Sequence, residues 1–454
     1  MAIHPPAFRR LLVLAGAGAA FAAFSQAQEP KPLPPSVLAP TPIGPGPKKI
    51  IPASGVVAPA EPAGRVPPTP KKPAPFDRFR NYDQLPDLTR ELVFATKGGM
   101  EWLSRDGIHQ ANGRFIPGLS PALGKVTEDD HFMRQALGAF ALARAARLTG
   151  EEKYDIRASQ TILSLLAEAP KDGGSPASRK PGLPSVVCNR VGGAAYLALA
   201  IYELPDAAPE MLQCGEELCQ YLRSRQQADG SISFSEAGET PEAEGVTLYP
   251  GPALVAIAMS NRHAPAEWKK QALVKALKFY REQFAASPSP MTVGWMCPAF
   301  VEMHLQSRDP AAAEFVFEMC DWLAKLQHDN SDRQRATWRG GFPQVAGGKI
   351  LSAAPTIETA YYAMAFADAC RMIRTMEKPD PARYDRYRAT LTRSLQFLTT
   401  LQYGEENTGH FAAHFRTALV GAFHPSTTDG NLRVDHTAVA VAAFCQYLIA
   451  GADR

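Results

Sequence analysis

Apolar residues recur at helical spacing almost everywhere after residue 85, whereas alternating, strand-like patterns are nearly absent. The pattern predicts an all-α domain of about twelve helices. We place them near residues 87–104, 131–148, 152–168, 189–203, 208–226, 250–261, 265–284, 292–306, 310–327, 355–375, 381–403 and 434–450.

The connections between these helices alternate between short turns and long loops. The long loops cover residues 105–130, 169–188, 228–248, 327–354 and 404–433, and the short turns between them are rich in Gly, Pro, Asp or Asn. An up-down array places odd and even connections on opposite faces, so we expect every long loop at the same end. Loops on a rigid scaffold commonly carry binding and chemistry, so this end is the predicted site.

The helices also alternate in composition. Residues 192–200 are mostly small and apolar, which predicts a helix buried on all sides, whereas residues 212–226 are amphipathic and should face solvent along one stripe. This alternation predicts two concentric layers, with the small-residue helices inside.

An aromatic–Leu pair, followed four residues after the leucine by Gln, recurs at the ends of the amphipathic helices. It occurs as Tyr221, Leu222 and Gln226, as Trp322, Leu323 and Gln327, and as Phe397, Leu398 and Gln402; Trp102 and Leu103 lead instead into Asn112 and Gly113. Such a repeat indicates one helical hairpin used several times. Six hairpins of this kind would close into a ring, an (α/α)6 toroid.

The repeat is similar to the Gln-containing repeats of squalene-cyclase and prenyltransferase toroids. Residues 248–254, 339–342 and 433–436 resemble bacterial α/α-toroid domains related to glucuronyl epimerases, polysaccharide lyases and glycosidases. The resemblance covers roughly residues 95–450 and implies the toroid fold and action on carbohydrate. Two positions depart from it. Thr127 stands in place of the first acid of the Asp-x-Asp-Asp motif of squalene-type cyclases, and Pro252 follows Tyr-Pro-Gly where such toroids often carry a carboxylate.

The first part of the chain has a different character. Arg9 and Arg10 precede an apolar stretch, and Ser25-Gln26-Ala27 is typical of a cleavage site, so residues 1–27 are predicted to be a signal peptide of an exported, periplasmic or secreted protein. Residues 28–80 are rich in Pro and Lys and predict a disordered tether, either to a cell-wall polymer or membrane surface or as an inert spacer. Residues 81–454 are the predicted toroid domain.

Composition narrows the function further. The seven cysteines are odd in number, lie mostly in apolar segments and show no metal-ligand spacing, which indicates buried thiols. A net charge of +3 without a basic, aromatic-rich stripe gives no indication of nucleic-acid binding. Asp129 and Asp130 lack the regular acidic spacing of a calcium loop. We expect a monomer without cofactor or metal whose partner is a glycan or another small molecule.

Candidate site residues lie where the inner helices begin, because free backbone N–H groups and the helix dipole favour anions there. As single residues, Asp130, Asn189 and Asp435 could equally cap helices, and His131 and His436 could be structural. The predicted catalytic residues are His131, Tyr249, Glu358, Asp435 and His436. The predicted substrate-binding residues are Asp130, Arg134, Asn189, Arg190, Trp295, Arg339, Phe342, Tyr361 and Arg433.

The arginines suit bidentate recognition of a carboxylate, as in uronic acids, or could pair with Asp130, Glu358 and Asp435. A lyase or epimerase needs a base, a cation for the enolate and a proton donor. His131, His436 or Tyr249 could be the base or acid, and Arg190 or Arg433 the cation. A hydrolase needs two carboxylates about 5 to 9.5 Å apart. The alternative is a non-catalytic glycan- or protein-binding toroid; terpene cyclisation is disfavoured because its acid motif is missing.

Overall fold

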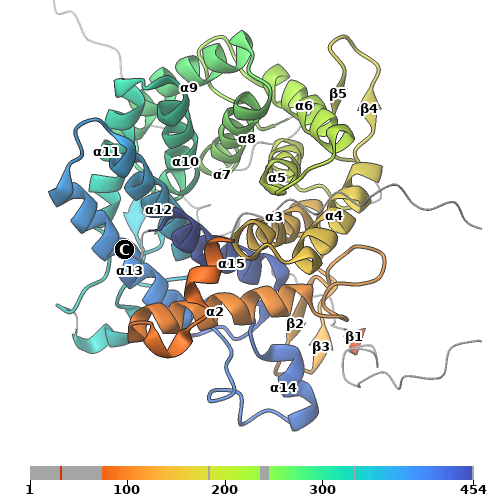
Figure 1. Cartoon of the computed structure of the whole chain (residues 1–454), viewed down its shortest axis with the longest axis vertical. Helices are drawn as coiled ribbons and strands as arrows, with labels where there is room; N and C mark the ends of the chain where they lie inside the picture. Colours follow the sequence, from red (N-terminus) through yellow and green to blue (C-terminus); the bar gives the residue numbers. More distant parts are fainter. Residues whose placement is uncertain are drawn as a thin grey trace, which may run out of the picture.

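The structure is a computed structural model that describes residues 74–182, 185–235, 245–331, 333–346 and 348–451, together with the backbone of residues 31–32. The predicted signal peptide and most of the predicted tether lie outside these residues. Six helices form an inner ring (Figure 1): α3 (Phe132–Thr149), α5 (Arg190–Glu203), α8 (Pro250–His263), α10 (Pro290–Ser307), α12 (Thr359–Thr375) and α15 (Val434–Ala450). Each packs against the next, and α15 packs against α3, which closes the ring.

A second ring of helices surrounds the first. It contains α2 (Asp87–Ser104), α4 (Glu152–Ala167), α6 (Pro209–Ser224), α9 (Glu267–Ala286), α11 (Pro310–Ala324) and α13 (Pro381–Thr399). Short turns join five inner helices to the outer helices that follow them, and α2 packs against α15, so that the first and last of these helices complete the array. The predicted two-layer, all-α ring is confirmed.

Small residues let the inner helices approach one another closely. A Cβ atom on Gly251 of α8 would lie 2.5 Å from Cβ of Trp295 on α10, and one on Gly294 of α10 would lie 2.9 Å from Cβ of Tyr361 on α12. Tyr249 sits in the same way against Gly192 of α5. The aromatic residue near the start of an inner helix therefore rests on a glycine of the preceding one, which explains the small-residue pattern.

The repeated glutamine links neighbouring outer helices. In each repeat the side-chain Nε2 donates to a backbone carbonyl of the next outer helix at 2.9 Å: from Gln226 to Ala272, from Gln327 to Thr390 and from Gln402 to Ala95. The same Nε2 atoms also donate to the carbonyls of Gly230, Gly340 and Gly421. These glutamines lie just beyond the ends of α6, α11 and α13. The observed helices therefore end a few residues before the predicted helices 208–226, 310–327 and 381–403.

The glycines of these turns have a left-handed backbone and touch the neighbouring helix. The φ angles of Gly230, Gly340 and Gly421 are +100°, +87° and +99°. A Cβ atom on any of them would lie 2.1 to 2.4 Å from a backbone oxygen of the next outer helix. In the first repeat His109 replaces glutamine: its Nε2 lies 3.2 Å from the carbonyl oxygen of Arg157 on α4. This substitution explains why the segment after Trp102 departs from the repeat.

The long loops carry short elements and contact one another at one end of the ring. The four-stranded sheet has the order β1 (Lys31–Pro32), β3 (Lys125–Val126), β2 (Gly118–Ser120), β8 (Leu432–Arg433), all antiparallel, with Gly118 opposite Arg433. The other elements are η2 (Pro75–Phe79), η3 (Tyr82–Gln84), η4 (Arg333–Trp338), α7 (Gly245–Leu248), α14 (Ala413–Leu419), β4 (Lys171–Asp172), β5 (Ser178–Arg179), β6 (Val345–Ala346) and β7 (Lys349–Ile350).

Backbone hydrogen bonds tie successive loops together where the inner helices begin. The amide of Phe132 donates to the carbonyl of Val186 at 2.9 Å, and the amide of Ile357 donates to that of Pro425 at 2.7 Å. The second bond holds residues 355–358 in the loop, so α12 begins at Thr359 rather than at residue 355. The long loops thus share one end of the ring, as predicted, and we call this end the long-loop mouth.

The fold also includes residues that the sequence assigned to the tether. The guanidinium Nη2 of Arg78 donates to the carbonyl of Leu448 at 2.7 Å, and Phe79 is buried.

None of the seven cysteines forms a disulfide with another described residue, and five of them are buried. Among the helices of the described residues, none combines the length and the apolar character that a membrane span requires.

Candidate functional site

Five predicted site residues meet where α15 and α3 begin. Arg433 is the N-cap residue of α15, positioned by the pairing of β8 with β2, and Asp435 and His436 follow in the first turn. Arg134 comes from the first turn of the neighbouring α3. We call Arg134, Arg433, Asp435 and His436, together with His131, the mouth cluster.

Ion pairs organise the mouth cluster. Arg433 binds Asp435 through both Nε, at 3.0 Å from Oδ1, and Nη2. Nε of Arg134 lies 3.6 Å from Oδ1 of Asp435, and its Nη2 lies 2.8 Å from Oδ2 of Asp129. Burial would raise the pKa of Asp435, but Arg433 and the other nearby cationic groups outweigh burial and hold the pKa well below its usual range. Asp435 is therefore an ionised carboxylate that cannot serve as a proton donor near neutral pH.

The two histidines of the cluster are uncharged near neutral pH. Burial, with Arg134 as the next cause, lowers the pKa of His131 to about 4. Burial and Arg433 lower the pKa of His436 to about 3. Nδ1 of His131 accepts the amide of Arg134 at 3.4 Å, which makes His131 the N-cap of α3. Nδ1 of His436 is buried and has no hydrogen-bond partner among the described residues.

The depressed pKa of His131 predicts a pH-dependent stability. The unfolded chain binds a proton near pH 6.5 and the folded chain only near pH 4, so the free energy of unfolding should fall as the pH drops through this window. His131→Asn keeps an N-cap acceptor but removes the titrating ring. We expect this variant to match the wild type at pH 7 and to lose less stability at pH 4, by up to about 3 kcal/mol, in urea denaturation. Parallel pH profiles would contradict this assignment.

Aromatic side chains form the layer below the cluster. The side chains of Tyr361 and Trp295 lie beside the hydroxyl group of Tyr196 and oppose, only in part, the effect of burial on its pKa. The ring centroid of Trp295 lies 5.4 Å from that of Tyr196 and 5.6 Å from that of Tyr361. Burial raises the pKa values of both tyrosines, so both remain protonated. The predicted residue Tyr361 thus joins the site together with Tyr196, which the sequence analysis did not select.

Other predicted residues have local structural contacts. Asn189 caps α5 by accepting the amide of Gly192 at 2.9 Å, and its Nδ2 donates to the carbonyl of Phe234. Oδ1 of Asp130 accepts Nε2 of Gln135 at 2.9 Å, and its Oδ2 lies 3.6 Å from Nη2 of Arg114. Burial raises the pKa of Asp130.

The remaining predictions lie at different depths. Phe342 is buried with its ring centroid 5.2 Å from that of Tyr362, and Arg339 is exposed in its loop. Tyr249 is buried against Gly192, whereas Arg190 and Glu358 are half-buried at the starts of α5 and α12. Burial, and after it acidic neighbours that include Glu358, raise the pKa of Tyr361, which places Glu358 near the aromatic layer. The predicted site residues at the starts of α3, α12 and α15 therefore lie closer to one another than the other predicted site residues do.

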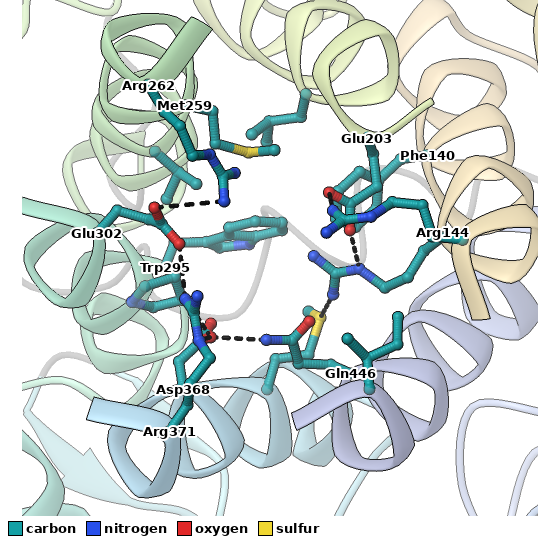
Figure 2. Close-up of a pocket in the computed structure, with 16 residues that line it drawn as sticks. Phe140, Arg144, Glu203, Met259, Arg262, Trp295, Glu302, Asp368, Arg371 and Gln446 are labelled. Carbon is teal, nitrogen blue, oxygen red and sulfur yellow. Dashed lines mark hydrogen bonds and ion pairs between the residues drawn. The ribbon is translucent and has the colours of Figure 1, made fainter. Parts of the chain in front are cut away.

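A pocket opens at the opposite end of the ring, beside the short turns (Figure 2). Trp295 forms its floor, so this predicted residue lies between the mouth cluster and the pocket. We call it the short-turn pocket. It has a volume of about 70 Å³ and is lined by Phe140, Arg144, Arg147, Leu199, Glu203, Val255, Met259, Arg262, Trp295, Pro298, Glu302, Met364, Asp368, Arg371, Gln446 and Ile449.

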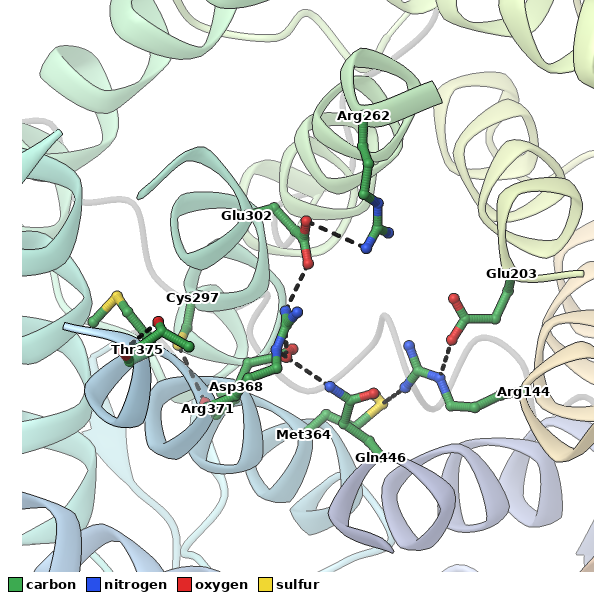
Figure 3. A network of polar contacts seen from close by, with 12 residues as sticks. Arg144, Glu203, Arg262, Cys297, Glu302, Met364, Asp368, Arg371, Thr375 and Gln446 are labelled. Atoms are coloured by element: carbon green, nitrogen blue, oxygen red, sulfur yellow. Dashed lines mark hydrogen bonds and ion pairs between the residues drawn. The ribbon is translucent and has the colours of Figure 1, made fainter. Parts of the chain in front are cut away.

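Two groups of ion pairs line the short-turn pocket (Figure 3). Oε1 of Glu203 accepts Nε of Arg144 at 2.6 Å. Its Oε2 accepts Nη1 of Arg147 at 2.8 Å. Burial would raise the pKa of Glu203, but Arg144 and Arg147 outweigh burial and lower it to about 2. On the other side, Nη2 of Arg371 donates to Oε1 of Glu302 at 2.6 Å.

The sequence analysis missed the charged residues of this pocket because it examined only helix starts. Arg144, Glu203, Arg262 and Glu302 lie in the second halves of inner helices, as do Asp368 and Arg371. The available signal was the placement of charges in otherwise small and apolar helices, because charged side chains are rarely buried unless they are paired. No group of three or more His, Cys, Asp or Glu side chains in the described part of the chain could hold a metal ion.

Comparison with known proteins establishes the fold. No protein-family model matches the chain, and no curated protein matches it. An unsaturated glucuronyl hydrolase specific for heparin is similar in structure over 79% of this chain and 96% of its own, with a TM-score of 0.55 and 10% sequence identity. The chain has the α/α-toroid fold.

Two further solved structures have the same arrangement. The α-1,6-mannanase from Salegentibacter sp. HEL1_6 matches over 79% of this chain and 99% of its own, with a TM-score of 0.55 and 11% identity. The cellobiose 2-epimerase from Spirochaeta thermophila DSM 6192 matches over 80% and 99%, with a TM-score of 0.52 and 13% identity. At these identities the comparison shows shared architecture, and the chemistry must be argued from this chain's own residues.

Proposed function

We propose that the protein is an exported enzyme that acts on a polysaccharide, most specifically a uronate-containing glycan, in the long-loop mouth, by lyase or epimerase chemistry. The observation that carries the proposal is the buried, uncharged His436, whose Nδ1 has no hydrogen-bond partner among the described residues. It lies beside Arg433 and Asp435, in a site that also contains protonated tyrosines. The carbohydrate-active toroids described above support the substrate class.

Each part of the cluster has a role in this chemistry. Both reactions begin by removing the proton next to the uronate carboxylate. The uncharged imidazole of His436 would take this proton once the substrate carboxylate lies beside Arg433 and offsets its charge, because an added anion raises the pKa of the ring. The guanidinium groups of Arg433 and Arg134 would neutralise the substrate carboxylate and the enolate formed from it. Tyr361, which stays protonated, would donate to the leaving oxygen in a lyase or to the opposite ring face in an epimerase.

Hydrolysis fits the cluster less well. A glycosidase needs one carboxylic acid that keeps its proton, whereas the pKa of Asp435 is well below its usual range. Asp130 has a raised pKa, and its Oδ1 accepts Gln135. Glu358 is the remaining predicted carboxylate. A hydrolase mechanism would therefore require Asp130 or Glu358 as the acid and Asp435 as the second group.

The second candidate function is glycan binding without catalysis. Arg134 and Arg433 already pair with Asp435, and Pro252 stands where related sequences often carry a carboxylate. A site whose charges are satisfied within the protein can bind hydroxyl groups and still lack a reacting acid or base. The binding and turnover measurements below separate the two functions.

The test is turnover on uronate-containing polysaccharides by the mature chain. We expect either ultraviolet absorbance from unsaturated uronates or, for an epimerase, deuterium incorporation from heavy water. His436→Gln should lower the rate about 10²- to 10⁴-fold, the usual contribution of a general base. His414→Gln, in an exposed histidine of α14, is the matched control and should keep full activity. Substrate binding by the wild type without either signal and without new reducing ends would leave the binding function; full activity of His436→Gln would place the base elsewhere.

A further inference from the structure

We propose that the short-turn pocket is a second ligand site, which takes one small sugar acid or a polyhydroxylated carboxylate of similar size. It lies at the other end of the inner ring from the mouth cluster, with Trp295 between the two (Figure 2). The proposal rests on the pocket's own residues and is independent of the proposed function of the mouth.

The pocket is lined by four arginines against three carboxylates. Glu203 binds Arg144 and Arg147, and both Glu302 and Asp368 bind Arg371. Arg262 shares Glu302 with Arg371 through a longer ion pair, in which its Nη1 lies 3.7 Å from Oε2, beyond ordinary hydrogen-bonding distance. Its side chain is 38% exposed. An anionic group entering the pocket would find a partly exposed guanidinium that is held only by this long ion pair.

A second guanidinium faces the same space. Arg144 is 9% exposed, and its Nη1 donates to Sδ of Met364 and to the carbonyl of Ala442, both at 3.3 Å. A thioether is a weak acceptor. No described residue accepts a hydrogen bond from Nη2 of Arg144. Arg144 on α3 and Arg262 on α8 both project toward the space beside Trp295 (Figure 2), so a carboxylate bound there could reach both.

The remaining polar groups suit hydroxyls. Nε2 of Gln446 donates to Oδ1 of Asp368 at 2.6 Å, and its Oε1 accepts no hydrogen bond from a described residue (Figure 3). Trp295, at the floor of the pocket, gives a sugar ring an apolar contact. One buried water needs about 10 to 15 Å³ of open space, so a pocket of about 70 Å³ holds only a few waters for the ligand to displace. The size fits a single ring rather than a polysaccharide.

The contrasting interpretation is that these ion pairs only close the end of the ring. In that case each cation should be saturated within the protein, as Arg371 is by Glu302 and Asp368. Arg262 and Nη2 of Arg144 are not. The Glu203 pair instead holds Arg144 in place, and the guanidinium groups of Arg144 and Arg262 point where a ligand would bind.

The test is calorimetric titration of the wild-type protein with glucuronate. We expect saturable binding that weakens about ten-fold or more in Arg262→Met, because charge-assisted hydrogen bonds are lost. Glucose lacks the carboxylate and propionate lacks the hydroxyls, so each should bind at least about ten-fold more weakly than glucuronate. Arg281→Met, on the outer surface where Arg281 pairs with Glu318, is the matched control and should leave affinity unchanged.

Binding at the mouth is distinguished by Arg433→Met, which should keep the binding event that Arg262→Met loses. The absence of saturable glucuronate binding in both the wild type and Arg433→Met would overturn the proposal. Unchanged affinity in a folded Arg262→Met variant would also overturn it, and equal affinity for glucose would overturn the assignment of a carboxylate ligand. Loss of turnover at the mouth with intact binding here would leave this proposal standing, so the two proposals fail separately.

Discussion

Gly340→Ala is expected to lower the free energy of unfolding by about 2 to 4 kcal/mol in chemical denaturation. Gly340 has φ +87°, a backbone conformation that disfavours side chains, and an added Cβ would lie 2.1 Å from the carbonyl oxygen of Arg393 on α13. Both strain and steric overlap therefore act at this position. Separation of α13 from the turn would also weaken the hydrogen bonds of Gln327, which bridges Gly340 and Thr390.

Gly124→Ala is the matched control for this prediction. Gly124 has a positive φ of +62°, but nothing lies within 4 Å of an added Cβ atom. This variant should lower the free energy of unfolding only by the strain of a left-handed backbone, about 1 to 2 kcal/mol. Equal losses in the two variants would mean that contact between the Gly340 turn and α13 contributes nothing to the stability of the ring.

Glu203→Gln should destabilise the protein by about 3 kcal/mol or more at pH 7, because removing one partner leaves a buried charge uncompensated. The side chain of Glu203 is 2% exposed and that of Arg144 is 10% exposed. Glu318→Gln removes a partner of Arg281 on the exposed outer surface and should cost less than about 1 kcal/mol. Urea denaturation of both variants gives the comparison, and equal effects would contradict the account of this pair.

The ion pair of Glu203 with Arg144 should lose its contribution to the free energy of unfolding in acid. The pKa of Glu203 is about 2 in the folded protein against an ordinary value of 4.5, so the unfolded chain binds more protons between these values. The stabilisation is fully present above about pH 4.5 and disappears as the pH falls toward 2. The difference between wild type and Glu203→Gln should therefore shrink over this window.

The fold was largely predictable because its signals are local. Helical periodicity, the turns between helices and the small-residue pattern each reflect a packing constraint that the structure confirms, such as Gly251 against Trp295. The repeated glutamines were visible in the sequence, but their role was not. Gln402, near the end of the chain, donates to Ala95 of the first outer helix, and no local pattern reveals which helices a closed ring makes neighbours.

The site was predictable only in part, for the same reason. The principle that helix starts favour polar groups led to Arg134, Asp435 and His436, which the structure brings together. It could not show that the side chain of Asn189 would serve as the N-cap of α5 or that Phe342 would be buried. The principle also directed attention away from helix ends, where Arg144 and Arg262 face the short-turn pocket. Whether the grouped residues perform catalysis stays a prediction.

A crystal structure of the mature protein with a glucuronate-containing oligosaccharide tests the central claim most directly. The account predicts a uronate in the long-loop mouth, with its carboxylate bound by Arg433 and its acidic C–H directed at the imidazole of His436. An oligosaccharide bound only on the outer ring, or a mouth that stays empty at saturating ligand, would contradict the claim that this end of the toroid acts on glycans.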